Sequence, residues 1–153
     1  MKKNDFPIEP AIAYKDFILT LTDEGKPDKG ILILSFTDGD GDIGLSEADT
    51  VPPFNPGSKY FYNFYISLFK KENGHYEKII FPDTNFTFNS RIPEIELTGN
   101  SKSIKGTIEY TFDLQIMNAY LNIDTIRIET YIYDKALHQS NIVVTPDIVI
   151  NNP

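Results

Sequence analysis

The segment TIEYTFDL, residues 107–114, alternates strictly between polar and apolar side chains. In an extended chain, Ile108, Tyr110, Phe112 and Leu114 point to one face, and the polar residues between them point to the other. This pattern predicts a β-strand with one buried face and one face in water. The fold can be worked out from this segment because the same alternation recurs along most of the chain.

The segment TIRIETYIYD, residues 125–134, alternates in the same way. Residues 31–36 (ILILSF) and 61–69 (FYNFYISLF) are apolar or aromatic on both faces, which is typical of central strands. Asn73-Gly74 lies between two strand-like runs and predicts a hairpin turn. We find no helical period, and we expect strands near residues 11–21, 30–37, 60–71, 76–81, 85–89, 105–116, 125–134 and 142–150.

These elements predict an all-β protein with an antiparallel β-sandwich of about seven to eight strands. The chain of 153 residues has the length of one domain. We therefore expect a single sandwich domain over residues 11–153, preceded by an extended segment over residues 1–10. The one long irregular stretch is residues 44–58, and connections of that length are usually functional or held in place by other contacts.

The overall charge argues against several classes of partner. The formal net charge is -8, from 22 acidic and 14 basic residues, which disfavours a nucleic-acid surface and docking on anionic lipid. There is no cysteine, so disulfides and cysteine zinc sites are excluded. No apolar stretch reaches membrane-spanning length, and residues 1–10 lack the apolar region of an intact signal peptide.

The loop SFTDGDGDIGLSE, residues 35–47, carries the most specific motif. Its glycines Gly39, Gly41 and Gly44 match the dinucleotide pattern G-x-G-x-x-G. That pattern requires a helix directly after the loop, and the prolines of residues 52–56 prevent one. Three carboxylates in the loop would also repel a pyrophosphate, so we reject the nucleotide interpretation.

A metal interpretation suits the charge of this loop better. Asp38, Asp40 and Asp42 alternate with glycines, which let the backbone fold tightly so that oxygen ligands converge on a hard cation such as calcium. The loop is not an EF-hand, because Ile43 occupies the glycine position and Asp49 the position of the final glutamate. In the alternative interpretation, the Asp-Gly repeats simply form tight turns whose aspartates bond the local backbone.

The C-terminal segment YIYDKALHQSNIVVTPDIVI, residues 131–150, resembles the last hairpin of fibronectin type III-like and bacterial immunoglobulin-like domains. Together with FTDGDGDIGL (residues 36–45) and RIP (residues 91–93), it is similar to uncharacterised envelope lipoproteins of the Bacteroidetes type. The resemblance implies an immunoglobulin-like, non-enzymatic domain in a bacterial cell envelope. Such proteins are tethered through a lipidated cysteine at the mature N-terminus, where this sequence has Met1.

The same resemblance suggests a further ligand. In a fibronectin-like sandwich, the loops after the second and sixth strands lie at the same end. That arrangement places Asp134 near Asp38, Asp40 and Asp42, with Ser140 or Asn141 in support. We therefore expect a calcium site formed by these four aspartates. Adhesion, scaffolding or ligand binding would follow, with other envelope proteins or a polysaccharide as partners.

Two other functions remain as alternatives. The rings within residues 60–65 form a carbohydrate-binding platform if at least two of them are exposed and coplanar; otherwise they pack in the core or pair across strands. A carboxylate-based hydrolase would need two acids facing a cleft. We expect His75 and His138 to be solvated loop residues, and Arg91 to pair with a carboxylate.

Overall fold

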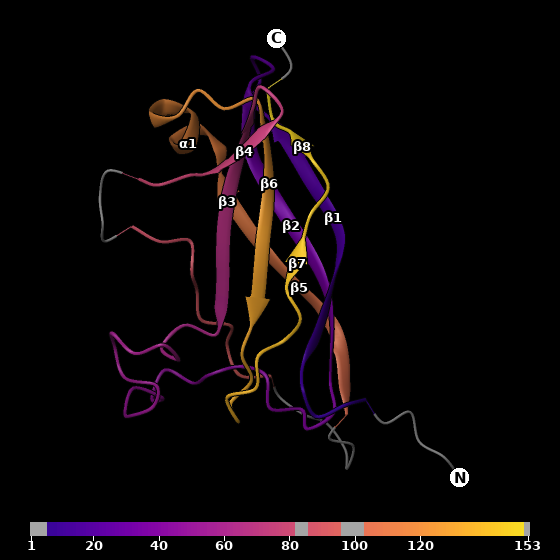
Figure 1. The fold of residues 1–153 in the computed structure, drawn as a ribbon, viewed down its shortest axis with the longest axis vertical. Coiled ribbons are helices and arrows are strands. Elements are labelled where there is room, and N and C mark those ends of the chain that lie inside the picture. Colours follow the sequence, from indigo (N-terminus) through magenta and orange to yellow (C-terminus); the bar gives the residue numbers. More distant parts are fainter. Residues whose placement is uncertain (1–5, 82–85, 96–102, 152–153) are drawn as a thin grey trace.

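The computed structural model describes residues 6–81, 86–95 and 103–151, so residues 1–5 of the expected N-terminal segment lie outside it. Two mostly antiparallel sheets face each other (Figure 1). One has the strand order β1-β2-β5, and the other has the order β4-β3-β6-β7, with β8 also paired to β6. The elements are β1 (Ala11–Leu21), β2 (Pro27–Asp38), β3 (Phe64–Glu72), β4 (His75–Lys78), β5 (Ile104–Asp113), α1 (Leu114–Tyr120), β6 (Thr125–Ile132), β7 (Val143–Val144) and β8 (Ile148–Val149). The predicted all-β fold is confirmed.

The side-chain alternation predicted for β5 and β6 is confirmed. Ile108 and Phe112 of β5 are buried, Tyr110 is half-buried, and Glu109 and Thr111, which lie between them, are exposed. The side chains of β6 that point inward are almost completely buried: Ile126, Ile128, Thr130 and Ile132. These inward faces meet between the two sheets and form the hydrophobic core.

The strands that are apolar on both faces are central, as predicted. Strand β2 lies between β1 and β5, and β3 lies between β4 and β6. The Asn73-Gly74 turn joins β3 to β4, and both residues have the positive φ angles (53° and 80°) that a tight hairpin turn requires. On the outer face of β3, Tyr65 stacks on Tyr131 of β6, as expected for a cross-strand pair.

The strand predicted for residues 105–116 ends earlier than expected, because a short helix replaces its last residues. Asp113 caps α1 by accepting hydrogen bonds from the backbone N–H groups of Gln115 (3.1 Å) and Ile116 (3.2 Å). Leu114 and Met117, which are three residues apart, both face the core. This short helix was not predicted, because the sequence shows no helical period.

Other predicted strand limits also change. Residues 86–89 form no strand, and residue 85 lies outside the described residues. Strand β3 begins at Phe64 rather than at residue 60, because residues 58–61 form bends and a turn. The closing strand predicted for residues 142–150 divides into β7 and β8, each of two residues.

The end of the sandwich opposite α1 carries the loops of interest (Figure 1). Residues 38–43 are called the acidic loop, and their first residue, Asp38, is also the last residue of β2. Residues 44–58, called the long loop, come next. Residues 133–141, called the last turn, follow β6. The backbone N–H of Lys135 donates to the Asp42 carbonyl at 2.9 Å, so the acidic loop and the last turn lie side by side, as predicted.

Candidate metal centre

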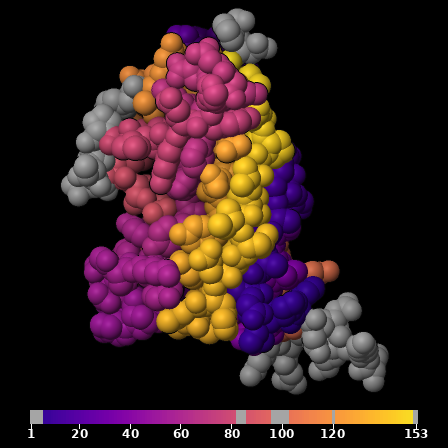
Figure 2. All heavy atoms as spheres, in the orientation of Figure 1, coloured from indigo at the N-terminus to yellow at the C-terminus, as the bar shows by residue number. Residues whose placement is uncertain are grey.

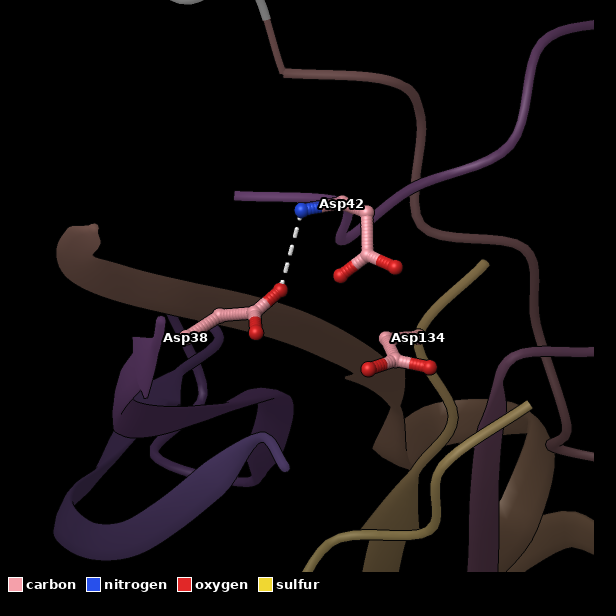
Figure 3. Close-up of side chains that lie close together, drawn as sticks. All are labelled: Asp38, Asp42 and Asp134. Atoms are coloured by element: carbon pink, nitrogen blue, oxygen red, sulfur yellow. Dashed lines mark hydrogen bonds between the residues drawn. The ribbon is translucent and has the colours of Figure 1, made fainter. Parts of the chain in front are cut away.

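Three of the four predicted ligands come together at this end (Figure 3). Asp38 is the last residue of β2, Asp42 belongs to the acidic loop and Asp134 lies in the last turn. Each contributes a carboxylate oxygen, and these three oxygens lie within 4.8 Å of one another. Asp38 is 0% exposed and Asp134 is 3% exposed. Asp40 stays outside this group, and its backbone N–H instead donates to Asp38 at 3.4 Å.

Most of the carboxylate oxygens accept backbone hydrogen bonds. Asp38 Oδ2 accepts from the Asp42 N–H at 3.0 Å, whereas the bond from the Asp40 N–H goes to Asp38 Oδ1. Asp42 Oδ2 accepts from the Ala136 N–H at 3.1 Å, and Asp134 Oδ1 from the His138 N–H at 2.7 Å. These bonds fix the orientation of all three side chains within the two loops.

One oxygen of the group has no partner among the described residues. Asp42 Oδ1 is buried and accepts no hydrogen bond from an N–H or hydroxyl group. A proton on Asp38 would supply a side-chain hydrogen bond to Asp42. A buried acceptor without a partner destabilises a fold by about 1–3 kcal/mol, and more when it is charged. Because native structures seldom leave such a group unsatisfied, this oxygen marks a position where a positive ligand fits.

The electrostatics of the group show that its negative charge is poorly compensated. Burial is the main cause that raises the pKa of Asp38 from its ordinary value of 3.8 to about 7, and a side-chain hydrogen bond with Asp42 and the charge of that residue add to it. Burial also raises the pKa of Asp134, although the hydrogen bonds from His138 oppose this shift. The Lys135 ammonium group faces Asp49 (3.3 Å) and Glu94 (3.8 Å) instead.

These shifts predict an unusual pH dependence for the metal-free protein. The folded state keeps a proton on Asp38 that the unfolded chain releases above about pH 4, so the free energy of unfolding falls between about pH 4 and 7. The raised pKa of His138, which is caused by its bond to Asp134, acts in the same direction. Urea midpoints measured in EDTA should therefore be lower at pH 8 than at pH 5. Asp38→Asn should remove most of this slope, and an unchanged slope in that variant would contradict the assignment.

The glycines of the motif are explained by close packing. Gly41 has φ 67°, and a Cβ atom at Gly44, which has φ 107°, would lie 2.3 Å from the Pro93 carbonyl oxygen. After Gly44 the chain forms an isolated bridge from Leu45 to Pro93 and then turns, with no helix among the described residues of the long loop. This geometry agrees with rejecting the dinucleotide interpretation.

The oxygen arrangement is compatible with a hard cation. Calcium binds oxygen at about 2.3–2.6 Å, so oxygens within 4.8 Å of one another can contact the same ion. Asp49, which lies close to the acidic loop in the sequence, is used elsewhere: its carboxylate accepts from the Ser46 N–H at 2.8 Å and faces Lys135. Glu47 is exposed.

The expected supporting residues of the last turn have other partners. Ser140 Oγ accepts from the Ile132 N–H and donates to the Asn141 carbonyl, both at 2.9 Å. The Asn141 amide bonds the backbone of Ile12. Sequence reasoning missed His138 instead: its Nδ1 lies 2.9 Å from Asp134 Oδ2, so it orients that carboxylate. The four-residue spacing of these two residues was the available signal.

Arg91 holds the long loop, although it does not pair with a carboxylate as expected. Its guanidinium donates to the backbone carbonyls of Phe61, Ser46 (3.1 Å) and Asp49 (2.8 Å). The same group lies 4.5 Å from the centre of the Phe61 ring. The planar fork of arginine suits this set of acceptors, which a lysine ammonium cannot reproduce.

Arg91→Lys should lower the free energy of unfolding by about 2 kcal/mol, because hydrogen bonds from a charged donor each contribute about 1.5–3 kcal/mol. Limited proteolysis should also cut the long loop faster in this variant. Lys26→Met is the control, since Lys26 forms an exposed ion pair with Glu24 and its loss should cost less than about 1 kcal/mol. Equal stability of the two variants would contradict the role given to Arg91.

The alternative functions fit the geometry less well. Within residues 60–65, Phe61 meets Tyr62 at 78° and Tyr62 meets Tyr65 at 87°, so these neighbouring rings are not coplanar. Asp38 and Asp134 are too deeply buried to face a sugar substrate, as a carboxylate-based hydrolase requires. His75 is exposed, as predicted.

Comparisons of the chain with protein families, with curated proteins and with solved structures found no match. No helix among the described residues is long and apolar enough to cross a bilayer.

Proposed function

We propose that this protein is a non-enzymatic, immunoglobulin-like domain of a bacterial cell envelope, and that a calcium ion fixes one of its ends. The strand orders β1-β2-β5 and β4-β3-β6-β7 support an immunoglobulin-like arrangement. The ion joins the acidic loop to the last turn through Asp38, Asp42 and Asp134. The ordered loops then serve as a scaffold, an adhesion surface or a binding surface for envelope proteins or a polysaccharide.

The observation that carries this proposal is the buried, unpartnered oxygen of Asp42. It lies among carboxylates from two loops far apart in the sequence, and two of the three side chains are almost completely buried. A tight turn alone explains bonds within the acidic loop, but it does not explain why Asp134 is brought against that loop. A bound cation accounts for both features, because it supplies the missing partner and offsets the mutual repulsion.

Calcium suits this donor set better than other common ions. The three candidate ligands are all carboxylates, and the ring Nδ1 of the nearby His138 is occupied by Asp134. Zinc and copper sites usually include imidazole or thiolate ligands, whereas oxygen-only sites select calcium, magnesium or manganese. Magnesium requires near-ideal octahedral geometry and keeps several waters, whereas calcium accepts irregular sets of oxygens.

Calorimetric titration of EDTA-treated protein with calcium tests the proposal directly. We expect one site in the wild type and a loss of at least tenfold in affinity in Asp42→Asn. This substitution keeps the size of the side chain and removes one negative charge. Asp23→Asn is the matched control, because Asp23 is an exposed aspartate of the β1–β2 turn, and this variant should bind like the wild type. No binding to the wild type at millimolar calcium would refute the proposal.

A further inference from the structure

Residues 6–12, called the N-terminal segment, run into the first two residues of β1 and are fastened to both loops of the candidate metal centre. Ala11 and Ile12 also pair with Thr37 and Phe36 of β2. The Gly39 N–H of the acidic loop donates to the Pro7 carbonyl at 2.8 Å. The Asn141 amide of the last turn forms two bonds with Ile12, one to its N–H and one to its carbonyl, each 2.8 Å long. In Figure 2, indigo atoms of the N-terminal part lie directly against yellow atoms of the C-terminal part.

The first of these contacts leaves no free space. A Cβ atom at Gly39 would lie 2.2 Å from the Phe6 carbonyl oxygen and 2.6 Å from that of Pro7. Only glycine permits this approach, so the contact with the N-terminal segment explains the first glycine of the DGDGD motif, Gly39. Pro10 and Ile12 are both buried, which shows that the segment packs against the sandwich as well as bonding to it.

The two fastening points belong to different loops, and their spacing depends on how those loops are held together. The protein's own bonds between the loops include two at Asp42, from the N–H groups of Lys135 (2.9 Å) and Ala136 (3.1 Å). Against these bonds acts the repulsion among three carboxylates. A cation bound among the carboxylates attracts all three of them, so it outweighs their mutual repulsion and holds the two loops at one spacing.

We propose that calcium binding controls the attachment of residues 6–12 to the domain. This inference rests on the proposed function, because it needs the same ion. With the ion bound, Gly39 and Asn141 are held at the spacing that both bonds to the N-terminal segment require. Without the ion, the loops separate and the segment detaches. By thermodynamic reciprocity, detaching the segment weakens calcium binding by the same factor.

Amide hydrogen exchange of the full chain, followed by NMR with calcium or with EDTA, tests this inference. The N–H groups of Gly39 and Ile12 donate the two diagnostic bonds, and both should exchange at least tenfold more slowly in calcium. The N–H of Ile66 on β3 is the internal control, because it donates to Asn89 Oδ1 and neither residue belongs to the two loops. Its protection should change less than that of Gly39 and Ile12.

Asn141→Ala provides the reciprocal test, since it removes both bonds to Ile12 without altering a carboxylate. Calcium should then bind this variant several-fold more weakly, while Ile12 exchanges quickly even when the ion is bound. If calcium binds the wild type but the exchange of Gly39 and Ile12 does not respond, the inference fails and the metal site stands. If calcium does not bind the wild type at all, both proposals fail.

Discussion

Saturating calcium should raise the melting temperature of this protein by roughly 5–10 °C relative to EDTA. An ion that binds only the folded state at a hundred times its Kd stabilises that state by about 2.7 kcal/mol. For a chain of this size, each kcal/mol moves the midpoint by roughly 2–4 °C. The expected effect is large because the proposed ion would supply a partner for Asp42 Oδ1 and replace the repulsion among three carboxylates with attraction. Thermal unfolding followed by circular dichroism measures the shift.

The isosteric variant Asp42→Asn separates this explanation from a general salt effect. In EDTA it should melt at or above the wild-type temperature, because one of the repelling charges is gone. In calcium it should show almost no further shift. Asp23→Asn should keep the full calcium response of the wild type. A calcium shift that survives in Asp42→Asn would place the ion somewhere else on the acidic surface.

Gly44→Ala should be the most damaging single substitution at this end of the sandwich. The residue has φ 107°, where a non-glycine residue is strained by about 1–3 kcal/mol. In addition, its new Cβ would lie 2.3 Å from the Pro93 carbonyl oxygen and 2.6 Å from the Glu94 Cα. Both neighbours are backbone atoms, so the Leu45–Pro93 bridge has to separate. We expect a loss of about 4 kcal/mol or more in the free energy of unfolding.

Gly57→Ala isolates the contribution of the collision. Gly57 has a similar φ of 86° in the long loop, but nothing lies within 4 Å of the position that a Cβ would take. This variant therefore carries the backbone strain alone and should lose about 1–3 kcal/mol. Urea unfolding of the two variants gives the comparison. Equal losses would show that the contact at Pro93 has no energetic weight.

The strands were predictable wherever burial on one face imposed a period of two. Residues 125–132 show this most clearly, because every second side chain of β6 is buried between the sheets. The Asn73-Gly74 turn was predictable for a different reason, since few residue pairs adopt two successive positive φ angles. In both cases the sequence signal is local and reports the local geometry.

The features that escaped prediction depend on non-local contacts or on very short signals. The helix α1 has seven residues, which is too few for a clear period of 3.6, so Asp113 as its cap was the usable signal. Residues 86–89 alternate like a strand, but Phe88 instead contacts the rings of Phe81 and Phe112. Such contacts between rings bury the apolar side chains of this segment without any pairing to a neighbouring strand.

The candidate site was predictable in outline. The resemblance to fibronectin-like domains placed the loops after the second and sixth strands at the same end, and so predicted that Asp134 approaches the acidic loop. The structure brings Asp134 against Asp38 and Asp42. The exclusion of Asp40 was not predictable, because it depends on the backbone turn at Gly41. The contact between Gly39 and Pro7 was equally hidden, since it involves backbone atoms whose approach leaves no pattern in side-chain chemistry.

The separation of the three carboxylates along the chain has a consequence for biosynthesis. Asp38 and Asp42 leave the ribosome long before Asp134, which follows the last long strand. A nascent chain that ends before Asp134 therefore carries Asp38 and Asp42 without the third carboxylate of the group. The calcium ion that we propose could therefore bind all three carboxylates only in chains that extend beyond Asp134, and it would favour these chains over shorter ones.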